Sequence, residues 1–532
     1  MEFHSRRSAV YAANGMVATS QPLASEAGVD VLRRGGNATD AALAAAAVLA
    51  VTEPSSCGLG GDAFALHYDS DSGEVTALDA SGRAPAELTL EPLLVLGHAT
   101  LPPRSAHAVT VPGTTSGFCA LHRRHGRLPM AEVFDSAIAL AHDGFPVAPV
   151  TAYHWELGAR LVLADAPGGH QLLLDGRAPR AGELVRNRDL ADVLRAIARG
   201  GARAFYTGVI AERIAGAVRA AGGLMTTDDL AAHEPTWRAP LSTVYGGLRV
   251  FECPPAGQGL VALQALAILA RLQLPGDRAD RLHLAIEALR LAFADARRHL
   301  GDPDRAAVPV AELLSADYVA ERAALIDPAR ARADVRAGRP LGGSDTVQLV
   351  AVDGDGNACS FIFSNYMGFG TGIVPAGLGF SLQNRGACFS LQPGHPNVLA
   401  PGKRPYHTII PALATREADG SLYGPLGVMG GFMQPQGHVQ VVLNLVDGDD
   451  PQAALDRPRV CIDGGDPDAG VAVETGLEAV ADALGGKGHR VRVVSGHARA
   501  LFGRGQIITR DPDSGVLCGG SDPRADGCAL GY

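Results

Sequence analysis

The stretch GGSDTVQLVAVDGDGNACSFIFSN, residues 342 to 365, has the pattern of a β-hairpin whose first strand begins at a threonine. Two apolar runs, 346–353 and 358–365, flank the short turn sequence GDGN. Asp, Gly and Asn favour the backbone conformations of tight turns, so the two runs are expected to pair as antiparallel strands. A loose GGSD segment precedes the first strand, and Thr346 stands where the two meet.

Thr346 admits two interpretations. Strands often begin with threonine, and taken alone the residue is weak evidence for catalysis. A self-generated nucleophile, however, needs a hydroxyl at the start of a strand held by a sheet, after a segment that can leave once the chain is cut. That hydroxyl attacks the preceding carbonyl, that of Asp345, and the resulting ester is hydrolysed. The freed α-amine, with an ordinary pKa of about 8, can then act as the base for its own hydroxyl.

The composition indicates a large globular protein. A chain of 532 residues is too long for one ordinary core, so two domains or one large layered domain are expected. With 47% apolar and 19% charged residues, it falls outside the disordered class. A formal charge of −10, without a stripe of Lys and Arg, argues against nucleic acid and anionic membrane as partners. The first residues lack the apolar core of a secretory signal, and no apolar run is long enough to span a bilayer, so a soluble, cytoplasmic protein is predicted.

Helical patterns dominate the chain before Thr346, and strand patterns are more frequent after it. Residues 37–54 predict a buried, Ala-rich helix capped by Thr39 or Asp40 and stopped by Pro54. Apolar spacings of three and four predict further helices over 130–144, 188–206, 209–223 and 281–302. Residues 325–344 are rich in Arg, Ala and Gly with little periodicity, which predicts a mobile connector.

No metal site or organic cofactor is predicted. The eight cysteines are scattered without CxxC pairs, so free buried thiols are expected. The 17 histidines form no HExxH motif and no cluster with ligand spacing. The glycine pair in GVMGGFMQ is either a tight turn or a place where backbone N–H groups of Gly430 and Gly431 approach a reacting carbonyl.

A series of motifs, taken in order, resembles the γ-glutamyltranspeptidase family over nearly the whole chain. These motifs are PSSCGLGGDAF, TVPGTTSGF, PPAGQG, ARRHLGDPD, DTVQLVAVDGDGNA, GFGTGIV, PGKRP, MGG and GSDPRADGCALGY. The resemblance implies an α+β fold, the four-layer αββα sandwich of the N-terminal nucleophile hydrolases. It also implies a precursor that is cut into a large subunit, 1–345, and a small subunit, 346–532, which stay associated and share one core.

The resemblance also places the catalytic groups. The family's nucleophilic threonine falls on Thr346, so the cut is expected between Asp345 and Thr346. The supporting hydroxyl falls on Ser364, a change from Thr to Ser that preserves the chemistry. The oxyanion-hole glycines fall on Gly430 and Gly431.

The pocket for a γ-glutamyl group is incomplete by the same alignment. Leu90 stands where the family has the Arg that binds the α-carboxylate, and Cys388 stands where it has the Asp that binds the α-ammonium. An Asn of the pocket becomes Tyr366, and a pair of Ser becomes His407 and Thr408. Because a hydrogen bond to a charged group contributes about 1.5–3 kcal/mol, γ-glutamyl compounds are not expected to be the main substrates.

Other polar residues are available to bind substrate, namely Tyr366, Asn384, Arg385, Arg404, His407 and Thr408. The stretches SNYMGFGTGIV, LQNRGACFSL and PGKRPYHTIIPA resemble the branch of the family that includes oxamate amidohydrolase. On this hypothesis Thr346 attacks the amide of a small carboxylate, which Arg385 or His407 binds, and water then releases the acid. Two alternatives stay open: a genuine γ-glutamyltransferase or glutathione hydrolase, and a catalytically silent binding protein.

Overall fold

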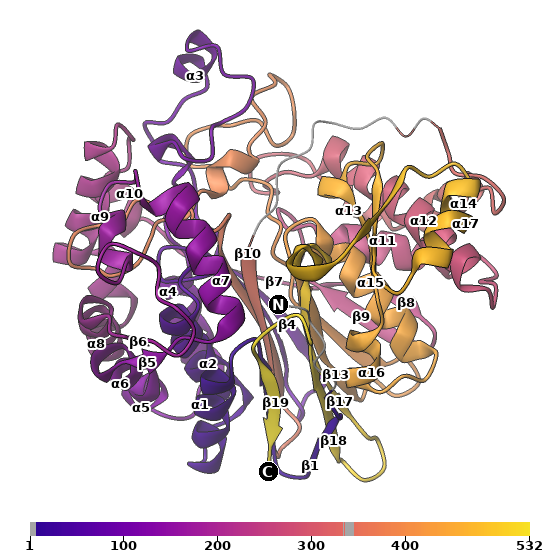
Figure 1. The fold of residues 1–532 in the computed structure, drawn as a ribbon, viewed down its shortest axis with the longest axis horizontal. Coiled ribbons are helices and arrows are strands. Elements are labelled where there is room, and N and C mark those ends of the chain that lie inside the picture. The colour runs from indigo at the N-terminus through magenta and orange to yellow at the C-terminus, as the bar shows by residue number, and fades with distance from the viewer. Residues whose placement is uncertain (1–6, 334, 336–344) are drawn as a thin grey trace.

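The computed structural model describes residues 7–333, 335 and 345–532, and two facing β-sheets form its centre (Figure 1). One seven-stranded sheet has the order β1 (Val10–Ala12), β18 (Leu517–Ser521), β17 (Arg504–Arg510), β13 (Leu422–Met429), β12 (Ala412–Arg416), β9 (Leu248–Glu252), β8 (Leu241–Tyr245). The other has the order β19 (Cys528–Gly531), β2 (Met16–Thr19), β10 (Asp345–Val352), β11 (Ala358–Tyr366), β3 (Asp62–Tyr68), β4 (Val75–Asp79), β7 (Thr236–Arg238). Smaller sheets join β14 (Val460–Ile462), β15 (Val471–Glu474) and β16 (Val491–Val494), and β5 (Phe145–Pro146) with β6 (Leu184–Val185).

Helices cover the outer face of each large sheet (Figure 1). Beside the sheet that contains β10 lie α1 (Pro22–Arg33), α2 (Ala38–Thr52), α4 (Thr114–His125), α5 (Met130–Val133), α6 (Asp135–Asp143), α7 (Pro149–Gly158), α8 (Arg188–Tyr206), α9 (Gly208–Ala220) and α10 (Thr227–Ala231). Beside the other sheet lie α11 (Gly259–Leu269), α12 (Arg278–His299), α13 (Val310–Leu313), α14 (Ala316–Ala323), α15 (Met433–Val446), α16 (Pro451–Asp456) and α17 (Glu478–Gly486), while α3 (Glu91–Val95) projects from the edge.

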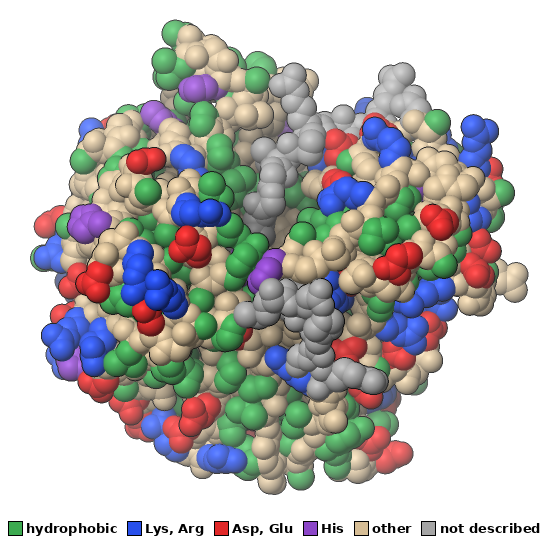
Figure 2. All heavy atoms as spheres, in the orientation of Figure 1, with side chains coloured by type: hydrophobic (Ala, Val, Ile, Leu, Met, Phe, Trp, Pro, Cys, Tyr) green, Lys and Arg blue, Asp and Glu red, His purple; other side chains and the backbone are tan. Residues whose placement is uncertain are grey.

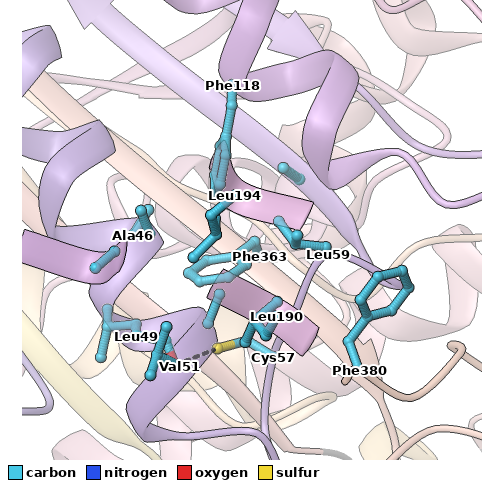
Figure 3. Close-up of a cluster of buried hydrophobic side chains, with 14 of the residues drawn as sticks. Ala46, Leu49, Val51, Cys57, Leu59, Phe118, Leu190, Leu194, Phe363 and Phe380 are labelled. Atoms are coloured by element: carbon cyan, nitrogen blue, oxygen red, sulfur yellow. Dashed lines mark hydrogen bonds between the residues drawn. The ribbon is translucent and has the colours of Figure 1, made fainter. Parts of the chain in front are cut away.

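Three hydrophobic layers hold these four structural layers together. The first packs helices α1, α2, α4 and α8 on the β10 sheet, and Figure 3 shows Phe118, Leu190 and Leu194 converging on Phe363 of β11. The second packs α11, α12 and α15 on the β13 sheet. The third, with Ile362 of β11, lies between the sheets. The predicted four-layer αββα arrangement is therefore confirmed.

The alternation along the predicted hairpin sets the direction of its side chains. Strands β10 and β11 pair antiparallel, as the sequence predicts. Leu349 packs toward the helices, whereas Val350 and Val352 pack toward the opposite sheet. Successive strand residues point to opposite faces, so Thr346 shares the face of Val350 and points between the sheets.

The Ala-rich helix α2 is buried over its whole length, as predicted, and it ends at Thr52, before Pro54. The predicted cap is wrong by two or three residues, because Asn37 is the cap. The Asn37 side chain accepts the Asp40 N–H at 3.0 Å, and Asp40 accepts the Asn37 N–H at 3.1 Å. Asp40 thus completes a capping box from inside the first turn instead of starting the helix.

Both large sheets contain strands from before and after Asp345, while most of the described helices precede it. Within the predicted connector, residues 334 and 336–344 lie outside the described residues. The described part is held in place: Ala331 donates its N–H to the Lys487 carbonyl at 2.8 Å, and the Val335 N–H donates to Asp468 at 3.1 Å. These bonds tie the segment to the loops that flank β15 and β16.

Charged side chains of both signs are interspersed among the described residues on the face drawn in Figure 2, and they form no continuous basic stripe on that face. In the part of the chain that the structure describes, no helix combines the length and the apolar character that spanning a membrane requires. All eight cysteines are free thiols, and six of them are buried.

Candidate active site

Thr346 is the second residue of strand β10, and its side chain is completely buried between the two sheets. Its Oγ1 hydroxyl donates a hydrogen bond to Ser364 Oγ on the neighbouring strand at 3.2 Å. The pairing register shifts here, because Asp345 pairs with Tyr366 whereas Val347 pairs with Phe363. Two residues of β11 therefore stand opposite Thr346, a bulge of the kind that re-aims side chains next to active sites.

A buried arginine lies next to the Ser364 hydroxyl group. Arg385, in the short 3-10 turn Arg385–Cys388, is 0% exposed. Its Nη2 lies 3.5 Å from Ser364 Oγ, and its Nη1 donates to Thr408 Oγ1 at 2.7 Å. The guanidinium also lies over the Tyr366 ring, 4.3 Å from the ring centroid, which helps to hold the cation in a low-dielectric site. The positively charged Arg385 side chain is thus connected to the Thr346 hydroxyl by two successive hydrogen bonds that meet at Ser364 Oγ.

Gln258 connects the arginine with the glycine pair. Its Nε2 donates both to the Thr408 carbonyl at 2.7 Å and to the Gly431 carbonyl at 2.8 Å. A continuous hydrogen-bonded path therefore runs from Thr346 through Ser364, Arg385, Thr408 and Gln258 to Gly431. The path fixes the glycine pair relative to the threonine hydroxyl.

Gly430 and Gly431 form the turn between strand β13 and helix α15. Their φ values of +134° and +60° are ones that other residues rarely adopt, and a Cβ on Gly430 would lie 3.1 Å from the Gly503 Cα. Helix N-termini carry partial positive charge and free N–H groups. The turn therefore places the backbone N–H groups of two glycines at the N-terminal end of α15, where the helix dipole favours an oxyanion.

His407 is bound to a carboxylate that the sequence patterns did not single out. Its Nε2 lies 3.0 Å from Asp62 Oδ2, and both side chains are completely buried. Burial raises the pKa of Asp62 to about 6, although Arg385 and the Gln383 amide oppose the rise. Burial and the nearby Arg385 charge lower the pKa of His407 well below its usual value. A neutral His407 donating to Asp62 follows, so His407 supplies no positive charge for a substrate carboxylate.

The raised pKa of Asp62 predicts a pH-dependent loss of stability. The folded chain holds the Asp62 proton more tightly than the unfolded chain, so this contribution is complete below about pH 4 and is lost as pH rises through about 6. Its size is on the order of 3 kcal/mol. Relative to Asp62→Asn, the wild type is expected to lose that much unfolding free energy between about pH 4 and 7, measured by urea denaturation. Parallel curves for the two proteins would contradict the assignment.

Two other predicted binding residues serve the scaffold. Asn384 donates its amide to the Pro103 carbonyl at 3.0 Å and accepts the Met367 N–H at 3.1 Å, so both ends are used by backbone. Arg404 donates to the Ser81 carbonyl, to Asp304 and to Thr236. Arg404 is completely buried, and these bonds give it a structural role.

Cys388 and Tyr366 both lie beside the Arg385 side chain. Burial raises the pKa of the Cys388 thiol, and the neighbouring Arg385 and Tyr366 side chains oppose the rise. Tyr366 is completely buried with φ +78°. Leu90 lies at the start of α3 and packs on the hydrophobic layer around α12. A neutral thiol beside a guanidinium offers nothing that would bind an ammonium group.

One group of potential metal ligands is present among the described residues, although the sequence spacing predicted none. His283, Glu287 and His489 have ligand atoms within 4.8 Å of one another. His283 Nδ1 hydrogen-bonds His489 Nε2 at 2.8 Å, and Glu287 accepts from Arg290 at 2.7 Å. These potential ligand atoms are already used in hydrogen bonds within the protein, and the positive charge of Arg290 would repel a metal cation bound beside it. The cluster instead holds α12 against the loop before β16.

Two residues of the candidate site, Asp62 and Gln258, are not singled out by any local sequence pattern. Asp62 follows the Gly pair of CGLGGDAF, and Gln258 lies in PPAGQG. Both were contained in recognised motifs, but an acidic residue at a strand start or a Gln in a turn gives no local chemical signal. Their partners lie 345 and 173 residues away in the chain, so only the fold connects them.

The chain is similar to known proteins along nearly its whole length. A family model described as gamma-glutamyltranspeptidase matches residues 24–532. The "Glutathione hydrolase-like YwrD proenzyme" of Bacillus subtilis is 36% identical, over 97% of this chain and 98% of its own length. The "Oxamate amidohydrolase proenzyme" of Klebsiella pneumoniae is 38% identical, over 98% of each chain.

A solved structure gives a similar result at the level of the fold. The cephalosporin acylase from Bacillus halodurans superposes with a TM-score of 0.92 at 45% identity, covering 99% of this chain and 97% of its own. The relatives named as proenzymes and this acylase are matched along their whole length.

Proposed function

Because this chain belongs to the γ-glutamyltranspeptidase family, we propose that it is an amidohydrolase whose nucleophile is Thr346 and whose substrate is a small carboxylate amide, not a γ-glutamyl compound. The family consists of N-terminal nucleophile hydrolases, so the predicted fold type and the prediction of a self-processing enzyme are confirmed. The observation that carries the proposal is the bond from Thr346 Oγ1 to Ser364, with Arg385 behind it.

The processing step uses Thr346 within the uncut chain. Its Oγ attacks the Asp345 carbonyl carbon, the peptide C–N bond breaks, and the α-nitrogen takes up a proton, which leaves an ester between the two residues. Water hydrolyses the ester, giving Asp345 a carboxylate and Thr346 a free α-amine. Ser364, at 3.2 Å, holds the hydroxyl in position for this attack. The products are a large fragment, 1–345, and a small fragment, 346–532, and pairing of their strands in both large sheets keeps them associated.

The turnover step reuses the same hydroxyl. The α-amine of Thr346 accepts the hydroxyl proton while Oγ attacks the substrate amide. The N–H groups of Gly430 and Gly431 stabilise the oxyanion, and the amine leaves with the proton. Water then attacks the acyl ester and releases the acid.

Charge supports a carboxylate rather than an amino acid as the acyl group. An α-ammonium bound beside Cys388 would lie next to the Arg385 guanidinium, and like charges at such a distance repel strongly in a buried site. A carboxylate is attracted to Arg385, and charge-assisted hydrogen bonds of this kind are stronger than neutral ones. The four residues Arg385, Thr408, Ser364 and Tyr366 thus favour an anionic acyl group.

An Arg385→Met variant tests this assignment. Loss of a hydrogen bond to a charged group costs about 1.5–3 kcal/mol, so kcat/KM for an oxamate-type anilide is expected to fall roughly 10- to 150-fold. The neutral 4-nitroacetanilide, which has the same leaving group and no carboxylate, is expected to lose much less. Arg385→Lys should recover part of the loss, because it restores the charge without the planar fork. An equal loss for both anilides would reject Arg385 as the carboxylate anchor.

The relatives named as glutathione hydrolases give the proposal its main competitor. Efficient hydrolysis of γ-glutamyl-4-nitroanilide, inhibited by free glutamate, would support that activity instead. Turnover of oxamate-type amides without γ-glutamyl turnover would support the present proposal. Failure to hydrolyse either class, together with an uncut chain, would favour a binding protein.

A further inference from the structure

A cavity of about 420 Å³ lies beside the candidate active site, between helix α12 and the segment that follows Arg385. Cys388 lines it, and its thiol is close enough to Arg385 and Tyr366 for both to oppose the rise of its pKa on burial. Phe432, which directly follows Gly431, lines the opposite wall. The cavity thus adjoins both the arginine and the glycine pair. Its volume falls within the usual range of small-molecule sites, and a two-carbon acid such as oxamate would leave most of it unfilled.

Apolar side chains form much of its wall. Leu300, Phe389, Leu391 and Tyr406 line the cavity and are at most 8% exposed. The hydroxyl of Tyr406 donates to Gln258 Oε1 at 3.0 Å, so the polar tip is used by the protein and the ring carbons are left for the cavity.

Two polar side chains of the wall, Asn397 and His395, are hydrogen-bonded to neighbouring protein groups. Asn397 donates to the Cys388 carbonyl at 2.7 Å and accepts the Tyr406 N–H at 2.8 Å. His395 Nε2 lies 2.9 Å from the Arg297 carbonyl, and its Nδ1 accepts the Asn397 N–H at 3.0 Å. A ligand group that needed hydrogen bonds here would have to compete with these bonds.

Arg297 is the one arginine or lysine among the described residues that line the cavity. It donates to the Gly465 carbonyl at 3.1 Å and to the Gly464 carbonyl at 2.9 Å. Its guanidinium lies over the Phe432 ring, 5.6 Å from the centroid. The cation is therefore held along the wall by carbonyls and a ring face.

We propose, on the basis of the function proposed above, that this cavity binds an apolar arm on the acyl group of the substrate. Cys388 touches the residue assigned to the carboxylate and lines the cavity, so the arm belongs on the carbon chain that bears the carboxylate. The substrate class is then the amide of a carboxylic diacid with an aryl or branched alkyl substituent next to the carboxylate. Burial of such an arm removes apolar surface from water without breaking a hydrogen bond of the wall.

The test compares malonyl-4-nitroanilide with benzylmalonyl-4-nitroanilide, which differ only by the apolar arm. The wild type is expected to prefer the benzyl compound in kcat/KM by about tenfold or more, as a filled apolar pocket gives. Ala296→Leu, which adds volume to the cavity wall from α12, is expected to reduce that ratio to near one. Ala294→Leu, on the same helix but lining a different cavity, is expected to keep the ratio.

A binding measurement separates this inference from the proposed function. Benzylmalonate is expected to raise the Tm of the wild type more than malonate does, and Ala296→Leu is expected to remove the difference. If both diacids act alike in the wild type, the inference is overturned even where anilide hydrolysis is normal. If the binding preference holds but no amide is hydrolysed, the inference stands and the proposed function fails.

Discussion

A Thr346→Ala chain is expected to remain a single polypeptide of about 54.9 kDa and to lose amide turnover by at least roughly 10⁴-fold. Both losses follow from one oxygen atom, because the same hydroxyl performs the cut and the later attack on substrate. The substitution removes the donor to Ser364 at 3.2 Å and leaves the apolar packing of β10 unchanged. Gel electrophoresis and an anilide assay measure the two losses on one sample.

Thr346→Ser is the matched control for that experiment. Serine keeps the hydroxyl and lacks only the methyl group, so cleavage and turnover are expected to persist at reduced rates. An alanine variant that is cut at the same peptide bond would show that another group supplies the nucleophile. A serine variant as inactive as the alanine variant would show that the hydroxyl is not the decisive feature.

An Arg524→Met chain is expected to lose about 3–5 kcal/mol of unfolding free energy, the usual effect of removing one partner from a buried ion pair. Arg524 donates to Glu474 at 2.8 Å and to Asp522 at 3.0 Å, and Arg459 donates to the other oxygen of Asp522 at 2.7 Å. All four side chains are at most 1% exposed. Methionine would remove the guanidinium that joins the two carboxylates and leave Asp522 with Arg459 and Glu474 with Arg499, which donates to it at 2.6 Å.

The control for this stability prediction is an exposed pair. Arg249 and Glu417 form an ion pair at 2.7 Å, with side chains about 40% exposed. Arg249→Met is expected to cost less than 1 kcal/mol, since solvent screens such pairs. Both substitutions are best compared in the Thr346→Ala background by urea denaturation, so that cleavage does not differ between samples. Similar losses for the two variants would mean that the buried network is not the stabilising element proposed.

Local patterns were sufficient to predict the hairpin and the buried Ala-rich helix, whereas the four-layer fold was predicted from the resemblance of the motifs to a known family. The alternation of 346–353 and 358–365 specifies a hairpin with one face toward helices, and β10 and β11 form it. The Ala-rich run of α2 specifies a buried helix, although its cap was assigned to Thr39 or Asp40 because Asn37 and Asp40 give competing capping signals. These features depend on neighbours within a few residues of each other in the chain.

The surroundings of the candidate substrate-binding residues depend on long-range contacts, which differ from one residue to the next. Arg385 and Thr408 lie together beside Ser364, whereas Asn384 and Arg404 serve backbone and ion-pair contacts elsewhere. A motif names the residue type but not the direction of its side chain. Asp62 shows the converse, because its role follows from His407 and Arg385, which the fold brings from the far side of Thr346.

The mass of the purified wild-type protein, with sequencing of any fragment's first residues, tests the central claim most directly. By residue share, a single cut before Thr346 gives fragments of roughly 36 and 19 kDa, and the smaller one begins with Thr-Val-Gln-Leu. That result would establish Thr346 as a chain terminus with a free amine beside its hydroxyl. An intact chain of 54.9 kDa with full amide turnover, or a small fragment that begins at another residue, would contradict the account.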